Sequence, residues 1–204
     1  MLRRLLQLYI GLVLYGVSTA LFVHANLGAD PWDVFHLGVA KQLGISFGTV
    51  IILTGAAVLL LWIPIRQMPG LGTVSNVIVL GLAADATLAV LPPLESMGAR
   101  SALLVGAIVL NAIATGMYIG AGFGPGPRDG LMTGLHARTG WSLRGIRTAI
   151  ELSVLLIGWL LGGKFGVGTV IYALSIGPLI QLCLPWFSQP VSRNAVSPPR
   201  EIVS

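Results

Sequence analysis

The stretch "NLGADPWD" at residues 26–33 returns ninety-six residues later as "GFGPGPRD" at residues 122–129. Both copies follow a long apolar run and interrupt it with a glycine, a proline and an aspartate at the same spacing. A proline is well tolerated at the first position of a helix, because its missing N–H would have no partner there. An aspartate in the first turn meets free N–H groups and the positive end of the helix dipole.

Two short polar helices are therefore predicted, one beginning at each proline of the repeated stretch. The preceding glycine lets the chain turn sharply, and the next matched glycine is expected to end the helix. The positions that define the two helices are Gly28, Pro31 and Gly44 in the first copy and Gly124, Pro127 and Gly140 in the second.

The composition indicates an integral membrane protein. Of the 204 residues, 55% are hydrophobic and only 9% are charged, whereas a soluble domain carries about 25% charged residues. The formal charge of +5 comes from basic residues that stand singly or in pairs between apolar runs. Nucleic acid is therefore excluded as a partner, and the lipid bilayer is the expected one.

Six apolar stretches approach the roughly 20 residues that cross a bilayer. They lie at about residues 5–25, 47–65, 71–91, 101–120, 143–161 and 167–187. With a cytoplasmic N-terminus, nine of the twelve Lys and Arg residues fall on the cytoplasmic side. The positive-inside rule then places both termini of this multi-pass protein in the cytoplasm.

The segments 30–43 and 126–139 leave an alternative of eight spans, which gives the same charge bias. Six spans are favoured, because each charge at the bilayer centre costs on the order of 3 kcal/mol. Whether the two segments re-enter the bilayer or lie at its surface stays open. The basic start of the chain resembles a signal peptide, but its apolar run belongs to the repeat and is interpreted as a retained span.

Without any gap, the two halves match at glycine, proline and aspartate positions along their length. We predict an all-α polytopic fold with repeats at residues 1–96 and 97–187 and a disordered cytoplasmic tail at residues 188–204. Each repeat has three spans, with the short polar helix after the first. Because three is odd, the second repeat must be inverted relative to the first, as in many transporters.

The stretches "LGADPWDVFHLGVAKQLGISFGTV" and "FGPGPRDGLMTGLHARTGWSLRG", with "GVGT" before the last span, resemble the uncharacterised bacterial YczE/YitT-type membrane proteins. The resemblance covers nearly the whole chain to about residue 187. It implies a protein of the bacterial cytoplasmic membrane. It implies no substrate, mechanism or catalytic residue.

The repeated stretch supplies three candidate pathway residues. Asp33 and Asp129 are either gating groups or caps of their helices. Arg128, which replaces Trp32 of the first copy, is either a ligand-binding group or a positive-inside anchor.

Asp85 lies about 9 Å inside the third span, at 1.5 Å per residue. Intramembrane carboxylates are candidates for function, and the repeat equivalent of Asp85 is the polar Gln181. We expect these two side chains to face one shared polar cavity.

The remaining candidates lie within spans. Glu151 follows Arg147 by four residues, so an ion pair is the alternative to a pathway role. Asn76 and Asn111 fit either interhelical hydrogen bonds or substrate contacts. Pro178 frees a backbone carbonyl inside the last span, which either lines a cavity or only shapes a kink.

No pattern of catalytic residues, metal ligands or cofactor-binding loops is present. The function expected is a small secondary permease or exporter of an unidentified small molecule or ion. The alternative is a non-transporting scaffold for a membrane-associated biosynthetic or secretion machine. The oligomeric state, including a homo-oligomer, stays open.

Overall fold

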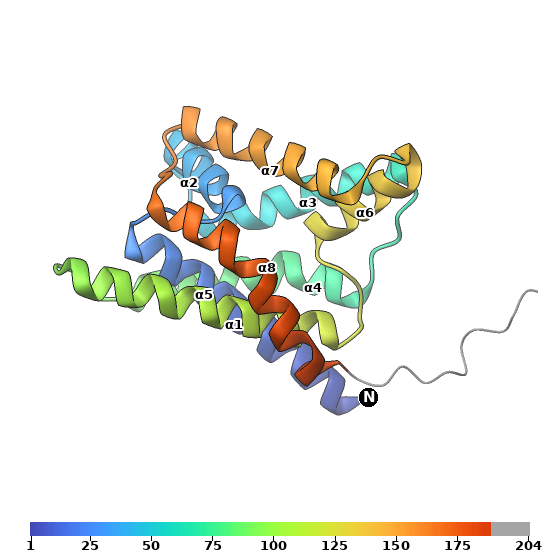
Figure 1. Cartoon of the computed structure of the whole chain (residues 1–204), viewed down its shortest axis with the longest axis horizontal. Helices are drawn as coiled ribbons and strands as arrows, with labels where there is room; N and C mark the ends of the chain where they lie inside the picture. Colours follow the sequence, from blue (N-terminus) through green and yellow to red (C-terminus); the bar gives the residue numbers. More distant parts are fainter. Residues whose placement is uncertain (189–204) are drawn as a thin grey trace, which may run out of the picture.

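The computed structural model describes residues 1–188, which form eight α-helices and no strand (Figure 1). In chain order the helices are α1 Leu2–Ala25, α2 Pro31–Leu43, α3 Phe47–Ile65, α4 Leu71–Val90, α5 Met97–Gly120, α6 Pro127–Thr139, α7 Leu143–Leu160 and α8 Val167–Phe187. Apart from Ser188, the predicted disordered tail lies outside the described residues.

The two short helices predicted from the repeated stretch are confirmed. Helices α2 and α6 begin at Pro31 and Pro127, and their C-caps are the left-handed glycines Gly44 and Gly140. Each has 13 residues, so each is roughly 20 Å long. That length is too short to cross a hydrocarbon core of about 30 Å.

Five of the described helices, α1, α3, α4, α5 and α8, are long and apolar enough to cross a membrane. Helix α7 is not among them, although a span was predicted at residues 143–161. Arg144, Arg147 and Glu151 lie in its first half, and these charges lower its hydropathy.

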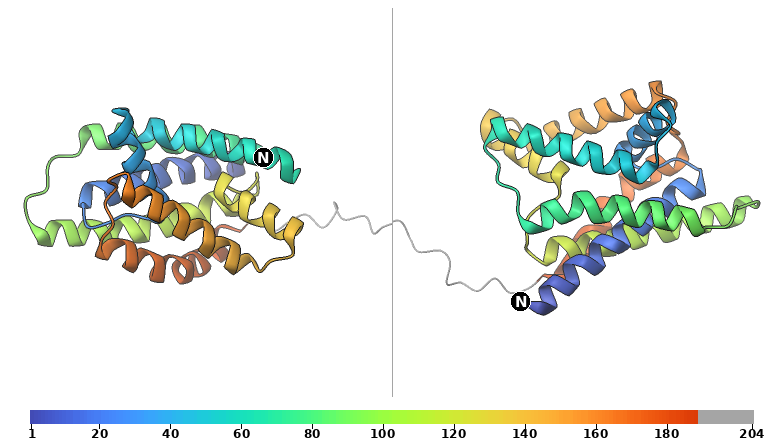
Figure 2. Two further views of the ribbon diagram at one scale, coloured as in Figure 1. Left: turned by 90° about the horizontal axis from the view of Figure 1, so that it is seen from above. Right: turned by 180° about the vertical axis from the view of Figure 1, so that it is seen from behind.

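Helices α1 and α5 pack against each other, α4 packs on α1, and α8 packs on α5 (Figures 1 and 2). The short helices pack on the opposite half, α2 on α7 and α6 on α3. Small residues allow close approach: a side chain at Gly16 of α1 would meet the Leu80 carbonyl of α4 at 2.5 Å. Helices α2 and α6 thus lie towards opposite ends of the molecule (Figure 1).

The two ends of the described chain lie together. Gln7 Nε2 donates a hydrogen bond to the carbonyl oxygen of Phe187 at 2.9 Å. The connection between α4 and α5, at residues 91–96, lies at the other end of the long axis (Figure 1). This arrangement fits an even number of crossings.

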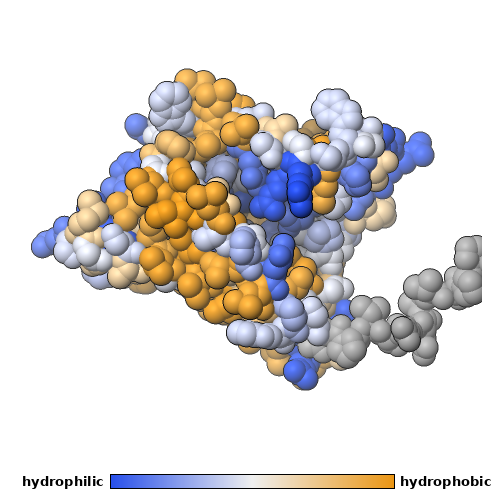
Figure 3. Space-filling view, viewed as in Figure 1, coloured by the Kyte–Doolittle hydropathy of each residue, from blue (hydrophilic) through white to orange (hydrophobic). Residues whose placement is uncertain are grey.

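Large apolar side chains remain exposed along the long helices, as expected for a surface that faces lipid. Examples are Leu53, Leu60, Leu82, Val105, Leu152, Leu156, Leu174 and Leu182. The space-filling view shows this apolar surface, interrupted by a hydrophilic hollow between α7 and α8 (Figure 3).

Candidate functional site

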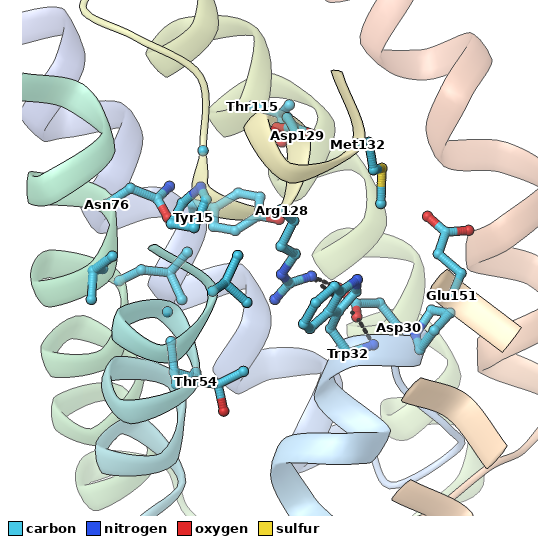
Figure 4. A pocket seen from close by; sticks show the side chains of 18 of the residues that line it. Tyr15, Asp30, Trp32, Thr54, Asn76, Thr115, Arg128, Asp129, Met132 and Glu151 are labelled. Atoms are coloured by element: carbon cyan, nitrogen blue, oxygen red, sulfur yellow. Dashed lines mark hydrogen bonds and ion pairs between the residues drawn. The ribbon is translucent and has the colours of Figure 1, made fainter. Parts of the chain in front are cut away.

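A cavity of about 240 Å³ lies at the centre of the molecule, where the N-terminal ends of α2 and α6 meet. Long helices of both halves complete its wall (Figure 4). The charged residues that line it are Asp30, Arg128, Asp129, Arg147 and Glu151. A cavity that brings several charged side chains together between otherwise apolar helices is the arrangement expected of a binding site.

Asp30 caps the start of α2. Its Oδ1 accepts hydrogen bonds from the backbone N–H groups of Trp32 at 2.7 Å and Asp33 at 3.0 Å. The residue is 4% exposed, so the cap is formed away from solvent. The capping role considered for Asp33 therefore belongs to Asp30, which stands directly before Pro31.

Arg128, at the start of α6, reaches across to the start of α2. Its guanidinium lies 3.2 Å from Asp30 Oδ2 and 3.9 Å from Asp33 Oδ1. It also stacks over the ring of Trp32, 5.0 Å from the centroid. Arg128 thus joins the two short helices, and in the sequence repeat it is the equivalent of the same Trp32.

Asp33 and His36 form a buried pair on α2, with Oδ1 and Nδ1 3.2 Å apart. Burial raises the pKa of Asp33, and the neighbouring Asp30 raises it further, while Arg128 opposes the change. Burial, followed by the charge of Arg128, lowers the pKa of His36. Both shifts favour neutral groups, so this contact is a hydrogen bond more than an ion pair.

Asp129 does not cap α6. The N-cap of α6 is Gly126, and no side chain within residues 1–188 caps its free N–H groups. Asp129 instead accepts a hydrogen bond from Tyr118 Oη of α5 at 3.0 Å, and it lines the cavity. Its carboxylate forms no ion pair with any described residue.

The two asparagines lie in different surroundings. Asn111 Nδ2 donates a hydrogen bond to Ser18 Oγ of α1 at 2.9 Å, and Asn111 Oδ1 accepts one from Tyr172 Oη of α8 at 3.4 Å. Asn111 therefore forms the interhelical hydrogen bonds that were one of its two predicted roles. Asn76 lines the cavity, and within the described chain its amide makes no hydrogen bond.

Glu151 accepts a hydrogen bond from Arg147 Nε at 2.8 Å. The predicted ion pair is therefore present. The pair also lines the cavity, and a pathway role for Glu151 stays a prediction.

Asp85 and Gln181 do not line the central cavity, contrary to the expectation that they share one. Asp85 Oδ1 accepts from the backbone N–H of Gly48 at 2.6 Å, and Oδ2 accepts from Ser46 Oγ at 2.5 Å. Asp85 therefore holds the start of α3 against α4. Gln181 is exposed on α8 and makes no such contact with α7.

The turn residues lie where the sequence placed them. Gly28 and Gly124 have φ of +109° and +115°, a region that favours glycine. Pro178 lies inside α8 without ending it, and its side chain is exposed.

Several residues of the site were missed from the sequence. Asp30 had a usable signal, because an aspartate directly before a helix-starting proline is a favoured N-cap. Trp32, Tyr118 and Thr115 had none, because apolar and hydroxyl side chains on helices are ordinary packing residues until their neighbours are known.

The chain matches the model of a family of unknown function, DUF6198, over residues 2–185. It is 38% identical over 177 residues to an uncharacterized protein of Haemophilus influenzae, covering 87% of this chain and 81% of the relative. It is 30% identical over 179 residues to the uncharacterized membrane protein YczE of Bacillus subtilis, covering 87% and 83%.

A third relative, the uncharacterized protein YyaS of Bacillus subtilis, is 23% identical over 180 residues, covering 86% of this chain and 90% of the relative. No solved structure matches significantly. The apolar helices and the membrane relative together identify an integral membrane protein. The chain belongs to the DUF6198 family and is related to the YczE-type membrane proteins.

Proposed function

We propose that the protein is a small secondary permease or exporter of the bacterial cytoplasmic membrane. A small molecule or ion would pass through the central cavity, between two inverted halves of three spans each. Helix α7 would be the sixth span, with its charged first turns at the cytoplasmic side. Both termini would be cytoplasmic, and α2 and α6 would enter the bilayer from opposite sides without crossing it.

The backbone supports the duplication. Helices α2, α3 and α4 begin at Pro31, Phe47 and Leu71, and α6, α7 and α8 begin ninety-six residues later. Every described residue with positive φ that lies in a turn has its equivalent in the other half. The pairs are Asn26 and Gly122, Gly28 and Gly124, Gly44 and Gly140, and Arg66 and Gly162.

Reciprocal contacts support a two-fold relation. Gly168 N donates to the Leu27 carbonyl at 2.8 Å, and Gly72 N donates to the Phe123 carbonyl at 2.9 Å. Each bond becomes the other when the halves are exchanged. A two-fold axis that relates halves of three spans lies in the membrane plane, and transporters with such repeats bind substrate at the repeat interface.

The contact between Trp32 and Arg128 carries the proposal. These residues are repeat equivalents, and a residue touches its own equivalent only close to a two-fold axis. Both line the cavity, so the cavity lies at the interface between the halves, where inverted-repeat transporters bind their substrates.

The two halves differ in a way that fits alternating access. In the first half, Gly81 of α4 packs on Gly48 of α3, and Asp85 bonds the start of α3. In the second half, a side chain at the equivalent Gly177 would meet nothing within 4 Å. The cavity is therefore closed between α3 and α4 and reaches the surface hollow between α7 and α8 (Figure 3).

Flux measurements test the proposal. The purified protein is reconstituted in liposomes, incubated with an isotopically labelled bacterial extract, and the retained solutes are identified by mass spectrometry. A permease accumulates specific solutes above the level of protein-free liposomes. No accumulation, together with a stoichiometric protein partner after gentle extraction, would favour the scaffold.

A further inference from the structure

Polar atoms from three helices converge on the uncapped start of α6. A methyl group on Gly126 would lie 3.1 Å from Tyr118 Oη, 3.4 Å from Asp129 Oδ2 and 3.9 Å from Asn76 Nδ2. The equivalent of Gly126 in the first half is Asp30, whose carboxylate fills that position on α2. The N-terminal end of α6 is thus open to the cavity, whereas the N-terminal end of α2 is capped by the Asp30 side chain.

Two buried side chains beside this point lack hydrogen-bond partners within residues 1–188. Thr115 is 7% exposed and its Oγ1 bonds nothing. Asn76 is 9% exposed and also makes no hydrogen bond. Both line the cavity, and Thr115 precedes Tyr118 by three residues on one face of α5. Buried polar groups are rarely left unsatisfied, so the Thr115 hydroxyl indicates a ligand, and the Asn76 amide lies in the cavity wall beside it.

A comparison of the two halves shows that the amide of Asn76 is available. Its repeat equivalent is Tyr172, which is bonded to Asn111. The repeat equivalent of Asn111 is Tyr15, so the first half also has one tyrosine and one asparagine at these two positions. Tyr15 and Asn76 lie near each other (Figure 4), but within the described chain they form no hydrogen bond. A 180° flip presents the amide oxygen to a ligand without breaking any hydrogen bond.

Charge decides the class of ligand. In the cavity wall, Arg128 pairs with Asp30 and Arg147 pairs with Glu151. Asp129 has no cationic partner among the described residues. The positive N-terminal end of α6 offsets roughly half an elementary charge. Within residues 1–188 the cavity wall thus holds three carboxylates and two arginines, and the exposed Asp129 is the carboxylate that forms no ion pair.

We propose that Asp129 anchors a binding site for one monovalent cation, either Na⁺ or the ammonium group of a transported solute. The other ligands are Tyr118, Thr115 and the flipped amide of Asn76. All of them offer oxygen, which suits a hard cation or an ammonium donor. A divalent ion such as Ca²⁺ takes six to eight oxygen ligands, several of them carboxylates, and a single carboxylate does not meet that need.

The proposal rests on the proposed permease, because the cation would be the cargo or the coupling ion of the same cavity. Binding is nevertheless measured without flux. Purified protein in detergent is heated at fixed pH and ionic strength in sodium, methylammonium or choline chloride. We expect sodium or methylammonium to raise the unfolding midpoint by a few degrees above choline. Equilibrium binding of ²²Na⁺ by scintillation proximity then gives the stoichiometry, expected near one if sodium is active.

Three variants localise the site. Asp129→Asn should abolish the cation-dependent shift, and Glu95→Gln, in the exposed connection at residues 91–96, should keep it. Thr115→Val removes a hydroxyl that bonds nothing, so its midpoint in choline should be unchanged or higher. Its cation affinity should fall about five- to tenfold, because one ligand is lost.

The outcomes show which kind of cation the site binds. A shift with sodium alone identifies an inorganic ion, and a shift with methylammonium alone identifies a solute ammonium. No shift with either cation overturns the site, even if flux is found. A shift that survives Asp129→Asn also overturns it. Cation binding that depends on Asp129 in a protein without flux would leave the site standing and remove the permease.

Discussion

Replacing Asp85 with alanine is expected to destabilise the fold by about 2–3 kcal/mol, because it frees the start of α3 from α4. The carboxylate accepts two hydrogen bonds, from Gly48 N–H at 2.6 Å and from Ser46 Oγ at 2.5 Å. A hydrogen bond to a charged group contributes about 1.5–3 kcal/mol. Asp85 is only partly buried, so the lower end of that range applies to each bond.

The conservative variant sharpens the prediction. Asp85→Asn keeps one oxygen to accept from Gly48 N–H but loses the charge and the second acceptor, so a loss of about 1 kcal/mol is expected. The matched control is Gln181→Ala at the repeat-equivalent position. Gln181 is exposed and does not contact the start of α7, so its effect should stay within about 0.5 kcal/mol.

The assay is reversible unfolding in mixed micelles, followed by circular dichroism against the mole fraction of SDS. The expected order of stability is wild type and Gln181→Ala, then Asp85→Asn, then Asp85→Ala. If the Asp85→Ala variant is as stable as the wild type, the carboxylate does not hold α3 to α4. The same conclusion follows if Gln181→Ala lowers the free energy of unfolding as much as Asp85→Ala does. The structural difference between the two halves would then need another cause.

Two further predictions concern topology and the turns. With Cys183 replaced by serine, a cysteine at Ser96 should react with an impermeant maleimide in intact cells; protection would contradict cytoplasmic termini with six spans. Gly124→Ala should cost at least about 2 kcal/mol, because it combines positive φ with a methyl group 2.8 Å from Thr73 Oγ1. Gly98→Ala, with nothing within 4 Å, should be neutral or stabilising in a thermal melt; equal losses for both glycines would refute the turn argument.

Local structure was predictable because its signals are local. Proline at the first position of a helix and glycine just past its end specify α2 and α6 to the residue. The long apolar runs likewise predict the long helices. Helix α7 shows the limit of this prediction, because its first turns carry charged residues. The segment forms a helix, but it is not apolar enough to be identified as a membrane span.

The candidate site was only partly predictable, because it depends on contacts between distant residues. Arg128 and Asp129 were identified from the repeated stretch, but their partners Asp30 and Tyr118 come from other helices. The pairing of Asp85 with Gln181 assumed that both halves adopt one conformation. Helix α3 contacts α4 while α7 stands away from α8, so equivalent positions have different neighbours.

If solute passes through the cavity, selective blockage of the cavity should stop transport. Thr54 of α3 lines the cavity, whereas the adjacent Leu53 is 55% exposed on the apolar surface (Figure 4). In a Cys183→Ser background, Thr54→Cys and Leu53→Cys proteoliposomes are treated with a charged methanethiosulfonate before uptake is measured. We expect the reagent to block uptake by the Thr54→Cys protein and to leave uptake by the Leu53→Cys protein unchanged. Uptake that is unaffected in a fully modified Thr54→Cys protein would contradict transport through this cavity.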